Sequence, residues 1–249
     1  MANKTNHNNN KPISDLGERM IPTQGGEVSF VFSRHLFAYR YLLPSVSNKS
    51  VLDIGCGTGY GSYILSGKAV SVVAVDYDKD AIDYCREHYQ NTNLKYLEMD
   101  AKQIELNEKF DIIVSFQMIE HLTQPKEFLV SIKRLLKSNG LVFISTPNVQ
   151  KPDHEKNKNP FHHHEMNDAQ FRDLLSGVFT SVEILGITYA SENKLRKWLG
   201  KMPFYKWGRY LKRNSKIKKI AGQALSMTEF KVVTDDIVNS ADLLAICHI

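Results

Sequence analysis

The sequence predicts an α/β protein built on a doubly wound parallel β-sheet. Three observations support this fold class. Short apolar runs typical of buried strands alternate along the chain with helical patterns. One such run, residues 51–54, leads into a cluster of four glycines and then into a helical pattern. Several runs end in polar residues, as expected where ligands bind beyond the carboxyl ends of parallel strands.

The composition is that of an ordinary globular protein. The chain has 249 residues, of which 42% are hydrophobic and 24% charged, enough for one α/β domain with a full core. No apolar run approaches the roughly 18 residues of a membrane span, and the N-terminus lacks an apolar signal region. The cysteines (Cys56, Cys85 and Cys247) are scattered, which indicates reduced thiols in a cytoplasmic protein and argues against structural zinc.

The elements are expected in a regular order. Residues 1–14 are polar and rich in asparagine, so a flexible tail is expected there, followed by one domain over residues 15–249. Residues 27–43 have helical spacing and precede Pro44; this helix is either a solvated cap or a lid over a ligand site. Other helices are expected after the glycines and at 80–89, 125–136 and 167–175. The third of these should be closed by a turn at residues 138–140, and the last capped by Asn167 or Asp168. Strands are expected at 51–54, 72–76, 94–99, 110–116, 141–145, 182–188 and 241–249.

The glycine cluster reads DIGCGTGYG from Asp53 to Gly61. Glycines in a strand–turn–helix unit allow unusual backbone angles and close approach of a ligand, and the helix end offers free N–H groups. About twenty residues later a second strand ends in Asp76, the spacing at which an acid holds ribose hydroxyls. Tyr60 stands where an NAD-binding turn has its third glycine, which disfavours a dinucleotide. A glycine-rich turn without a ligand is the alternative.

DIGCGTG resembles motif I of the class I S-adenosylmethionine (SAM) dependent methyltransferases, and VVAVDYD at residues 72–78 resembles their acidic loop. The resemblance covers residues 51–186 and the last strand. It implies a Rossmann-like sheet of seven strands, mostly parallel with an antiparallel last strand, and SAM as the cofactor.

The same resemblance implies a set of cofactor contacts. The SAM amino-acid part would pass Gly55, Gly57 and Gly59, with the ribose on Asp76, adenine against Tyr77, and the adenine amino group on Asp100 beside the Ala101 backbone. Asp53 and Gln117 also follow strand ends and are counted with this site. A turn residue at Asp76 and a helix cap at Asp100 are the alternatives.

His121 is the first candidate for chemistry on the acceptor. SAM carries an activated methyl group, so the protein must align the acceptor and, for a hydroxyl, remove its proton. A histidine suits that role, although one that only packs or caps is equally compatible with the sequence. Residues 117–121, QMIEH, resemble the metal-holding ExxEH element of ubiquinone-type O-methyltransferases. Glu120 and His121 remain, but Gln117 replaces the first acid, so no obligatory metal is expected.

A second candidate group is NPFHHHE at residues 159–165, in a long polar loop. It resembles the NPFHxxE stretch of bacterial methyltransferases found with polysaccharide and lipid-glycan pathways. His162 and Glu165 occupy positions of that pattern and are expected to line the acceptor pocket; structural hydrogen bonding is the alternative. Consecutive histidines point to different sides, so one compact site could not use all three.

Residues 194–219 carry eleven Lys and Arg and no acid, whereas the other 21 basic residues face 27 acids. This stretch lies in an expected insertion at residues 189–228 and holds both tryptophans. Three interpretations remain: an element facing an anionic membrane or lipid-linked substrate, a nucleic-acid surface, or a homodimer element. The first is preferred to nucleic acid.

Together these features predict SAM-dependent methyl transfer to a sugar hydroxyl in a glycan, nucleotide sugar or lipid-linked saccharide. The enzyme is expected in the cytoplasm or at the inner face of the membrane. A quinone- or phenol-type O-methyltransferase is the alternative among enzymes. A non-catalytic SAM-binding module that contacts RNA is the alternative outside them, and steep salt dependence of binding would distinguish it.

Overall fold

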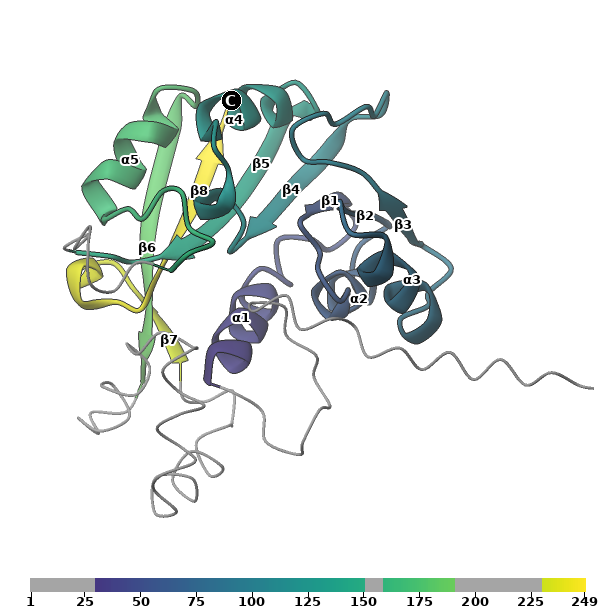
Figure 1. The fold of residues 1–249 in the computed structure, drawn as a ribbon, viewed down its shortest axis with the longest axis horizontal. Coiled ribbons are helices and arrows are strands. Elements are labelled where there is room, and N and C mark those ends of the chain that lie inside the picture. The colour runs from purple at the N-terminus through teal and green to yellow at the C-terminus, as the bar shows by residue number, and fades with distance from the viewer. Residues whose placement is uncertain (1–29, 151–158, 191–229) are drawn as a thin grey trace, which may run out of the picture.

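The computed structural model describes residues 30–150, 159–190 and 230–249. The predicted tail at residues 1–14 lies outside them, as does nearly all of the predicted insertion at 189–228. The described residues form an eight-stranded sheet with the order β3-β2-β1-β4-β5-β8-β6-β7 and helices on both faces (Figure 1).

The elements alternate as the sequence predicts. The helices are α1 (Phe30–Tyr41), α2 (Tyr60–Ser66), α3 (Lys79–His88), the 3-10 turn η1 (Ile119–His121), α4 (Pro125–Lys133), α5 (Asp168–Ser176) and the 3-10 turn η3 (Ile237–Asn239). The strands are β1 (Ser50–Ile54), β2 (Ser71–Asp76), β3 (Leu94–Glu98), β4 (Phe110–Phe116), β5 (Leu136–Pro147), β6 (Ser181–Tyr189), β7 (Phe230–Val233) and β8 (Asp242–His248).

The strand directions confirm the Rossmann-like α/β fold. Strands β1 to β5 pair in parallel, and β8 lies antiparallel between β5 and β6. The expected number of seven strands was wrong. Strand β6 continues past its pairing with β8, and its last four residues, Gly186 to Tyr189, pair with β7. Strand β7 follows the predicted insertion at residues 189–228. Its four residues form too short an apolar pattern to be recognised as a separate strand.

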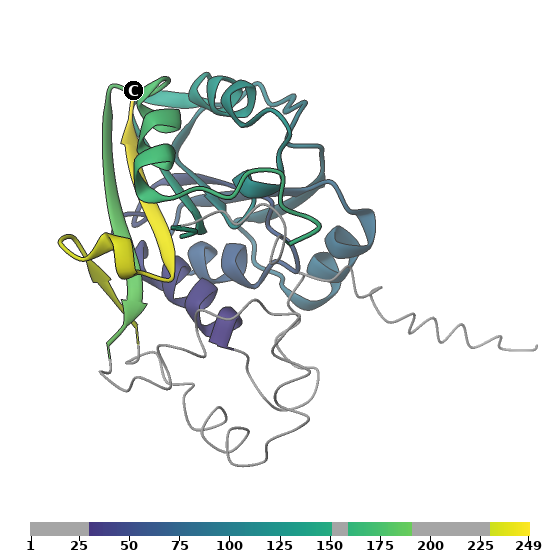
Figure 2. The same ribbon diagram turned by 60° about the vertical axis from the view of Figure 1, so that its left-hand side comes forward.

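Two hydrophobic cores lie on opposite faces of the sheet. Successive strand residues face opposite sides, so Val51 packs with α1 and α2 whereas Leu52 packs with α4 and α5. Figure 2 shows the sheet and its flanking helices from a second direction. Because β1, β2, β4 and β5 are parallel, their carboxyl ends lie at one edge of the sheet, where the candidate site is found.

Two local predictions had different outcomes. The cap of α5 is confirmed: Asn167 and Gln170 form a reciprocal capping box. The turn expected at residues 138–140 lies instead within β5, which begins at Leu136 because that residue pairs with Phe110 before a shift in register.

Among the described residues, no helix combines the length and the apolar character needed to cross a bilayer.

Candidate active site

The glycine turn between β1 and α2 is open at its centre. Gly55, Gly57 and Gly59 all have positive φ, at 75°, 54° and 80°, a region that glycine enters without strain. A Cβ on Gly55 would lie 2.8 Å from Met118, and one on Gly59 would lie 2.6 Å from Cys85. Among the residues that the structure describes, no heavy atom lies within 4 Å of the corresponding position on Gly57. A ligand could therefore approach the backbone at Gly57.

Asp53 lies beneath this turn. Its side chain is fully buried, and its two oxygens accept hydrogen bonds from Ser62 Oγ (2.6 Å) and Tyr39 OH (3.2 Å). Burial raises its pKa to about 7, although both hydrogen bonds act in the opposite direction. Asp53 is placed to hold the turn against α1 and α2, so a contribution to cofactor binding would be indirect.

Asp76 ends β2 beside the turn. Its Oδ2 accepts from the Gly57 N–H at 2.9 Å and its Oδ1 accepts from the Asp78 N–H at 3.0 Å. A carboxylate has about four lone-pair sites and is the kind of acceptor that ribose hydroxyls require. The neighbouring Tyr77 is 68% exposed, as expected of a ring that would lie against a purine.

The remaining predicted cofactor residues follow the ends of β3 and β4. Asp100 is exposed, and its Oδ1 accepts from the Lys102 N–H at 2.9 Å; the next residue, Ala101, is half-buried. Gln117 has a φ of 52°, unusual for a residue other than glycine, and its Nε2 donates to Ser145 Oγ at 3.2 Å. The residues around the open turn thus fit SAM: a carboxylate for hydroxyls, an exposed ring, and a second carboxylate for an amino group.

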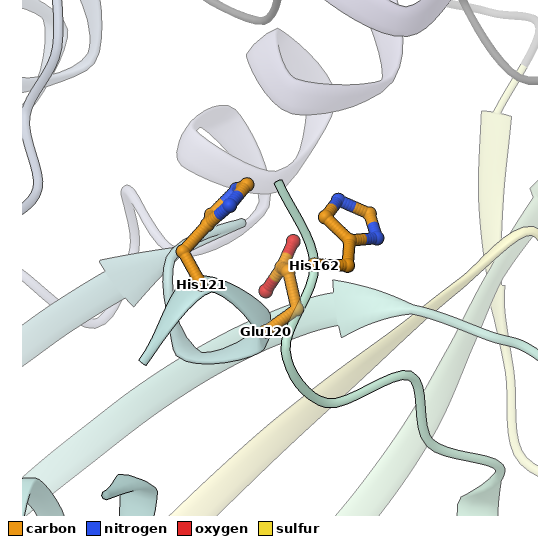
Figure 3. A group of neighbouring side chains, drawn as sticks. All are labelled: Glu120, His121 and His162. Atoms are coloured by element: carbon orange, nitrogen blue, oxygen red, sulfur yellow. The ribbon is translucent and has the colours of Figure 1, made fainter. Parts of the chain in front are cut away.

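The predicted catalytic residues meet in space. Glu120 and His121 lie in η1, and His162 comes from the loop after β5 (Figure 3). The potential ligand atoms of these three side chains all lie within 4.8 Å of one another. The loop that carries His162 is bound to η1 through the Glu120 carbonyl, which accepts hydrogen bonds from the N–H groups of His163 (2.8 Å) and His164 (3.0 Å).

His121 is held in a definite tautomer. Its Nδ1 lies 2.9 Å from the Phe161 carbonyl oxygen. A carbonyl only accepts, so Nδ1 carries the proton and Nε2 of the neutral ring keeps its lone pair. The half-buried ring can therefore take up a proton at Nε2.

His162 has a different environment. Asn159 Oδ1 accepts from the Phe161 N–H at 3.1 Å, so its Nδ2 is the group that donates to His162 Nε2 at 3.1 Å. His162 Nδ1 then carries the proton and lies 3.3 Å from Glu165 Oε1. Both nitrogens are engaged within residues 159–165, so the contacts of His162 shape this loop, and its expected place in an acceptor pocket stays a prediction. The third histidine, His164, lies with its Nε2 3.4 Å from the Thr123 carbonyl, so the rings of His162 and His164 have different partners.

Glu120 is almost completely buried, and its Oε2 accepts from Thr146 Oγ1 at 3.1 Å. Burial raises its pKa to about 7, although His121 and His162 act in the opposite direction. One carboxylate and two imidazoles at this spacing could hold a divalent cation such as zinc. Nδ1 of His121 and both nitrogens of His162 take part in the contacts described above. The absence of an obligatory metal stays a prediction.

The sequence did not single out several partners of these residues. Thr146 and the Phe161 carbonyl orient Glu120 and His121, and Arg34 of α1 forms a buried ion pair with Asp242. A backbone carbonyl has no sequence signal. Asp242 did have a sequence signal: it is an acid at the start of an apolar strand, and such an acid needs a partner when it is buried.

Comparisons with known proteins identify the family of this chain. The family model described as "Methyltransferase domain" matches residues 45–201. A probable S-adenosylmethionine-dependent methyltransferase of Mycobacterium tuberculosis is 36% identical over 177 residues, which cover 69% of this chain and 63% of that protein. This chain thus spans less than two thirds of that relative.

Two further matches are informative. The ubiquinone biosynthesis O-methyltransferase of Glaesserella parasuis is 40% identical over 108 residues, 40% of this chain and 46% of that protein. The structure of a SAM-dependent methyltransferase from Archaeoglobus fulgidus matches with a TM-score of 0.60 and 20% identity, over 88% of this chain and 95% of the other. Since the family model covers more than half of the sequence, this chain belongs to the methyltransferase domain family and shares with these relatives the fold and cofactor class of the SAM-dependent methyltransferases.

Proposed function

We propose that this protein transfers a methyl group from SAM to a hydroxyl oxygen. The observation that carries the proposal is the hydrogen bond from His121 Nδ1–H to the Phe161 carbonyl. It fixes the tautomer of the neutral imidazole in which Nδ1 carries the proton and Nε2 is the basic nitrogen, at the edge of the sheet where the cofactor turn lies. Hydroxyl acceptors need such a base, because their proton must leave as the new O–C bond forms.

SAM, when bound, supplies a methyl group activated by its sulfonium. We assign its amino-acid part to Gly55, Gly57 and Gly59, its ribose to Asp76 and its adenine to Tyr77. Asp100, Ala101 and Gln117 would complete the adenine and methyl ends. Asp53 would support the turn from below.

The acceptor side is assigned to Glu120, His121 and His162. His121 would accept the hydroxyl proton at Nε2 and become an imidazolium, which the adjacent Glu120 stabilises when ionised. Glu165 keeps His162 in one tautomer, and the two would line the acceptor pocket. The oxygen gains the methyl group, the proton ends on His121, and S-adenosylhomocysteine (SAH) is the second product.

We propose a sugar hydroxyl, in a glycan, nucleotide sugar or lipid-linked saccharide, as the acceptor. The NPFHHHE loop supports this choice, because it supplies amide, imidazole and carboxylate groups, which hydrogen-bond hydroxyls well. The basic residues between 194 and 219 would attract an anionic lipid or phosphate carrier, placing the enzyme at the inner face of a membrane.

A quinone or phenol hydroxyl is the second candidate acceptor. It is favoured by the printed name of the Glaesserella parasuis relative, a ubiquinone biosynthesis O-methyltransferase, whose match includes no more than 40% of this chain. The same base would serve, since phenols also lose a proton on methylation.

The test is transfer of labelled methyl from SAM into a cell extract that is then separated into lipid, glycan, nucleic-acid, protein and small-molecule fractions. Label in glycan or glycolipid supports the sugar acceptor. Label in an apolar phenolic lipid supports the quinone alternative and overturns the sugar. Label in RNA alone would overturn both, and no SAM binding at all would overturn the proposed function.

A further inference from the structure

Helix α1 makes a buried polar contact toward each half of the candidate site. Near its start, Arg34 Nε lies 2.5 Å from Asp242 Oδ2, with side chains only 8% and 2% exposed. Near its end, the Tyr39 hydroxyl donates to Asp53 Oδ1 at 3.2 Å. The two helix positions are five residues apart, about 7.5 Å along the axis.

The two contacts reach different strands. Asp53 lies in β1 beneath the glycine turn, whereas Asp242 begins β8, and β4 and β5 separate these strands in the sheet. Three strand spacings of about 4.8 Å amount to roughly 14 Å. Between them, the Tyr39 ring packs edge-on against Phe116 of β4 at 4.9 Å. Helix α1 thus crosses the sheet from the cofactor side to the acceptor side.

Asp242 is connected to the loop that carries His162. It pairs in the sheet with Pro147, the last residue of β5. The next residue, Asn148, donates its backbone N–H to the Ala241 carbonyl at 3.1 Å, and Val149 donates to the Met166 carbonyl at 3.0 Å. The loop at residues 159–166 is therefore connected by backbone hydrogen bonds to the end of β5, which pairs with the start of β8, where Arg34 contacts Asp242.

A buried ion pair is a poor choice for stability alone. The cost of removing two charges from water often exceeds their attraction, and apolar pairs of similar volume are commonly as stable or more so. Burial raises the pKa of Asp242 to about 6 despite Arg34, so the carboxylate does carry such a cost. What a buried ion pair provides is a firm connection between two elements, because separating it leaves an uncompensated buried charge.

We propose that Arg34 and Asp242 are positioning residues which, together with Tyr39, transmit cofactor occupancy of the glycine turn to the acceptor loop at residues 159–166. This inference rests on the proposed function, because it requires a cofactor at the turn and an acceptor at the loop. A cofactor that orders the turn would fix Asp53 and Tyr39, then α1, and through Arg34 the start of β8 and the loop.

The test is hydrogen–deuterium exchange of the full chain with and without saturating SAH. In the wild type we expect SAH to slow exchange at least threefold both at residues 55–61 and at residues 159–166. In the double variant R34M/D242L, which removes both charges, protection should persist at 55–61 and vanish at 159–166. Coupling between two sites is reciprocal. The Kd of this variant for SAH should therefore rise by no more than the factor by which protection of the loop is lost, about threefold.

Two variants keep the test decisive. Tyr39→Phe retains the ring and removes the hydroxyl, so it should also lose loop protection. This variant tests the coupling independently if R34M/D242L fails to fold. Lys79→Met removes an ion pair with Asp83 that is 66% and 48% exposed, and should leave the exchange pattern unchanged. Once an acceptor is known, R34M/D242L should lower kcat about tenfold with little change in the Kd for SAM.

The outcomes separate this inference from the proposed function. If wild-type protein does not bind SAH, the proposed function fails. If SAH binds and protects only residues 55–61 in the wild type, the coupling is overturned while the proposed function stands. Loop protection that persists in both R34M/D242L and Y39F would equally overturn it, and would assign the ion pair to stability alone.

Discussion

At the scale of single residues, hydrogen-bond partners decide what each histidine can do. His121 and His162 have ring centres 4.9 Å apart, yet their nitrogens are engaged differently. The bond from His121 Nδ1 to the Phe161 carbonyl fixes the tautomer in which Nε2 is the basic nitrogen, whereas His162 has Nδ1 close to Glu165 and Nε2 bonded to Asn159. The base is therefore assigned from the partners of each ring and not from its position.

His121→Ala should lower kcat about a hundredfold or more, the usual contribution of a positioned base. The Kd for SAM should stay unchanged, because His121 lies on the acceptor side. His162→Ala should instead raise the KM for the acceptor. Steady-state kinetics with the identified acceptor and calorimetric titration of SAM would measure these effects. An unchanged kcat in the His121 variant would remove it from the mechanism.

Asp53 should make stability depend on pH. Its pKa is raised from about 3.9 in an unfolded chain to about 7 in the folded protein, so the native state binds the proton more tightly. The contribution of Asp53 to the free energy of unfolding should therefore fall as pH rises from 4 to 7, by at most about 1.4 kcal/mol per pH unit.

Asp53→Asn cannot titrate, so urea unfolding across this range should show a flatter pH dependence than in the wild type. Part of the slope should remain, because burial also raises the pKa of Glu120 to about 7 and that of Asp242 to about 6. The exposed Asp83 is a control: Lys79 lowers its pKa, so Asp83→Asn should not alter the slope above pH 5. Equal slopes for wild type and Asp53→Asn would refute the assignment.

At the scale of elements, α1 approaches α2 most tightly at Gly61, beside ring contacts of Phe32 and Tyr39 with Tyr60. A Cβ on Gly61 would lie 2.2 to 2.4 Å from three ring atoms of Tyr39, so the helices fit only with glycine there. The same tyrosine bonds Asp53. The fourth glycine of the DIGCGTGYG stretch thus serves helix packing, whereas Gly57 provides the open backbone.

Gly61→Ala should destabilise the protein by about 1 to 3 kcal/mol, the usual cost of overpacking a core. Gly177→Ala is the matched control, because its nearest neighbouring atom would be 3.4 Å from the added Cβ and its φ is −68°. Adding Tyr39→Ala to the Gly61 variant should cost less than the two changes summed. Chemical denaturation measures all four proteins, and a Gly61 variant as stable as wild type would contradict the packing argument.

Local patterns made most elements predictable. Strand β4 runs from Phe110 to Phe116 as its apolar run indicates, and the cap of α5 at Asn167 has its own sequence signature. Strand β7 was missed because four residues at a sheet edge carry little periodicity. The start of β5 was misplaced because Ser138 to Gly140 resemble a turn, while pairing with β4, which the sequence does not display, makes them strand.

At the scale of the whole molecule, the parallel sheet brings the chemistry together. Polar residues after β1, β2, β4 and β5 were expected at one edge, because parallel strands end on the same side. The meeting of His121 with Phe161, forty residues later, was not predictable. It depends on how a loop folds back onto η1 through the Glu120 carbonyl, and such backbone contacts leave no residue pattern.

The charge of the molecule is unevenly distributed, and this leads to the last prediction. The net charge of +5 arises from residues 194–219, which carry eleven basic residues and no acid. Changing Lys212, Arg213, Lys216 and Lys218 to Gln should raise the KM for an anionic or lipid-linked acceptor several-fold. The Kd for SAM should not change, because the assigned cofactor residues all precede residue 118. The effect should shrink in high salt, which screens exposed charges.

A control of equal charge separates location from net charge. It replaces four exposed lysines of the described sheet domain by Gln: Lys68, Lys95, Lys102 and Lys109. If both sets raise KM equally, net charge alone attracts the acceptor and the segment has no special role. If the first set weakens SAM binding as much as acceptor binding, the segment supports the fold. Only a rise in KM confined to the first set, and lost in high salt, makes residues 194–219 part of acceptor recognition, since a local charge effect is both position-dependent and screened.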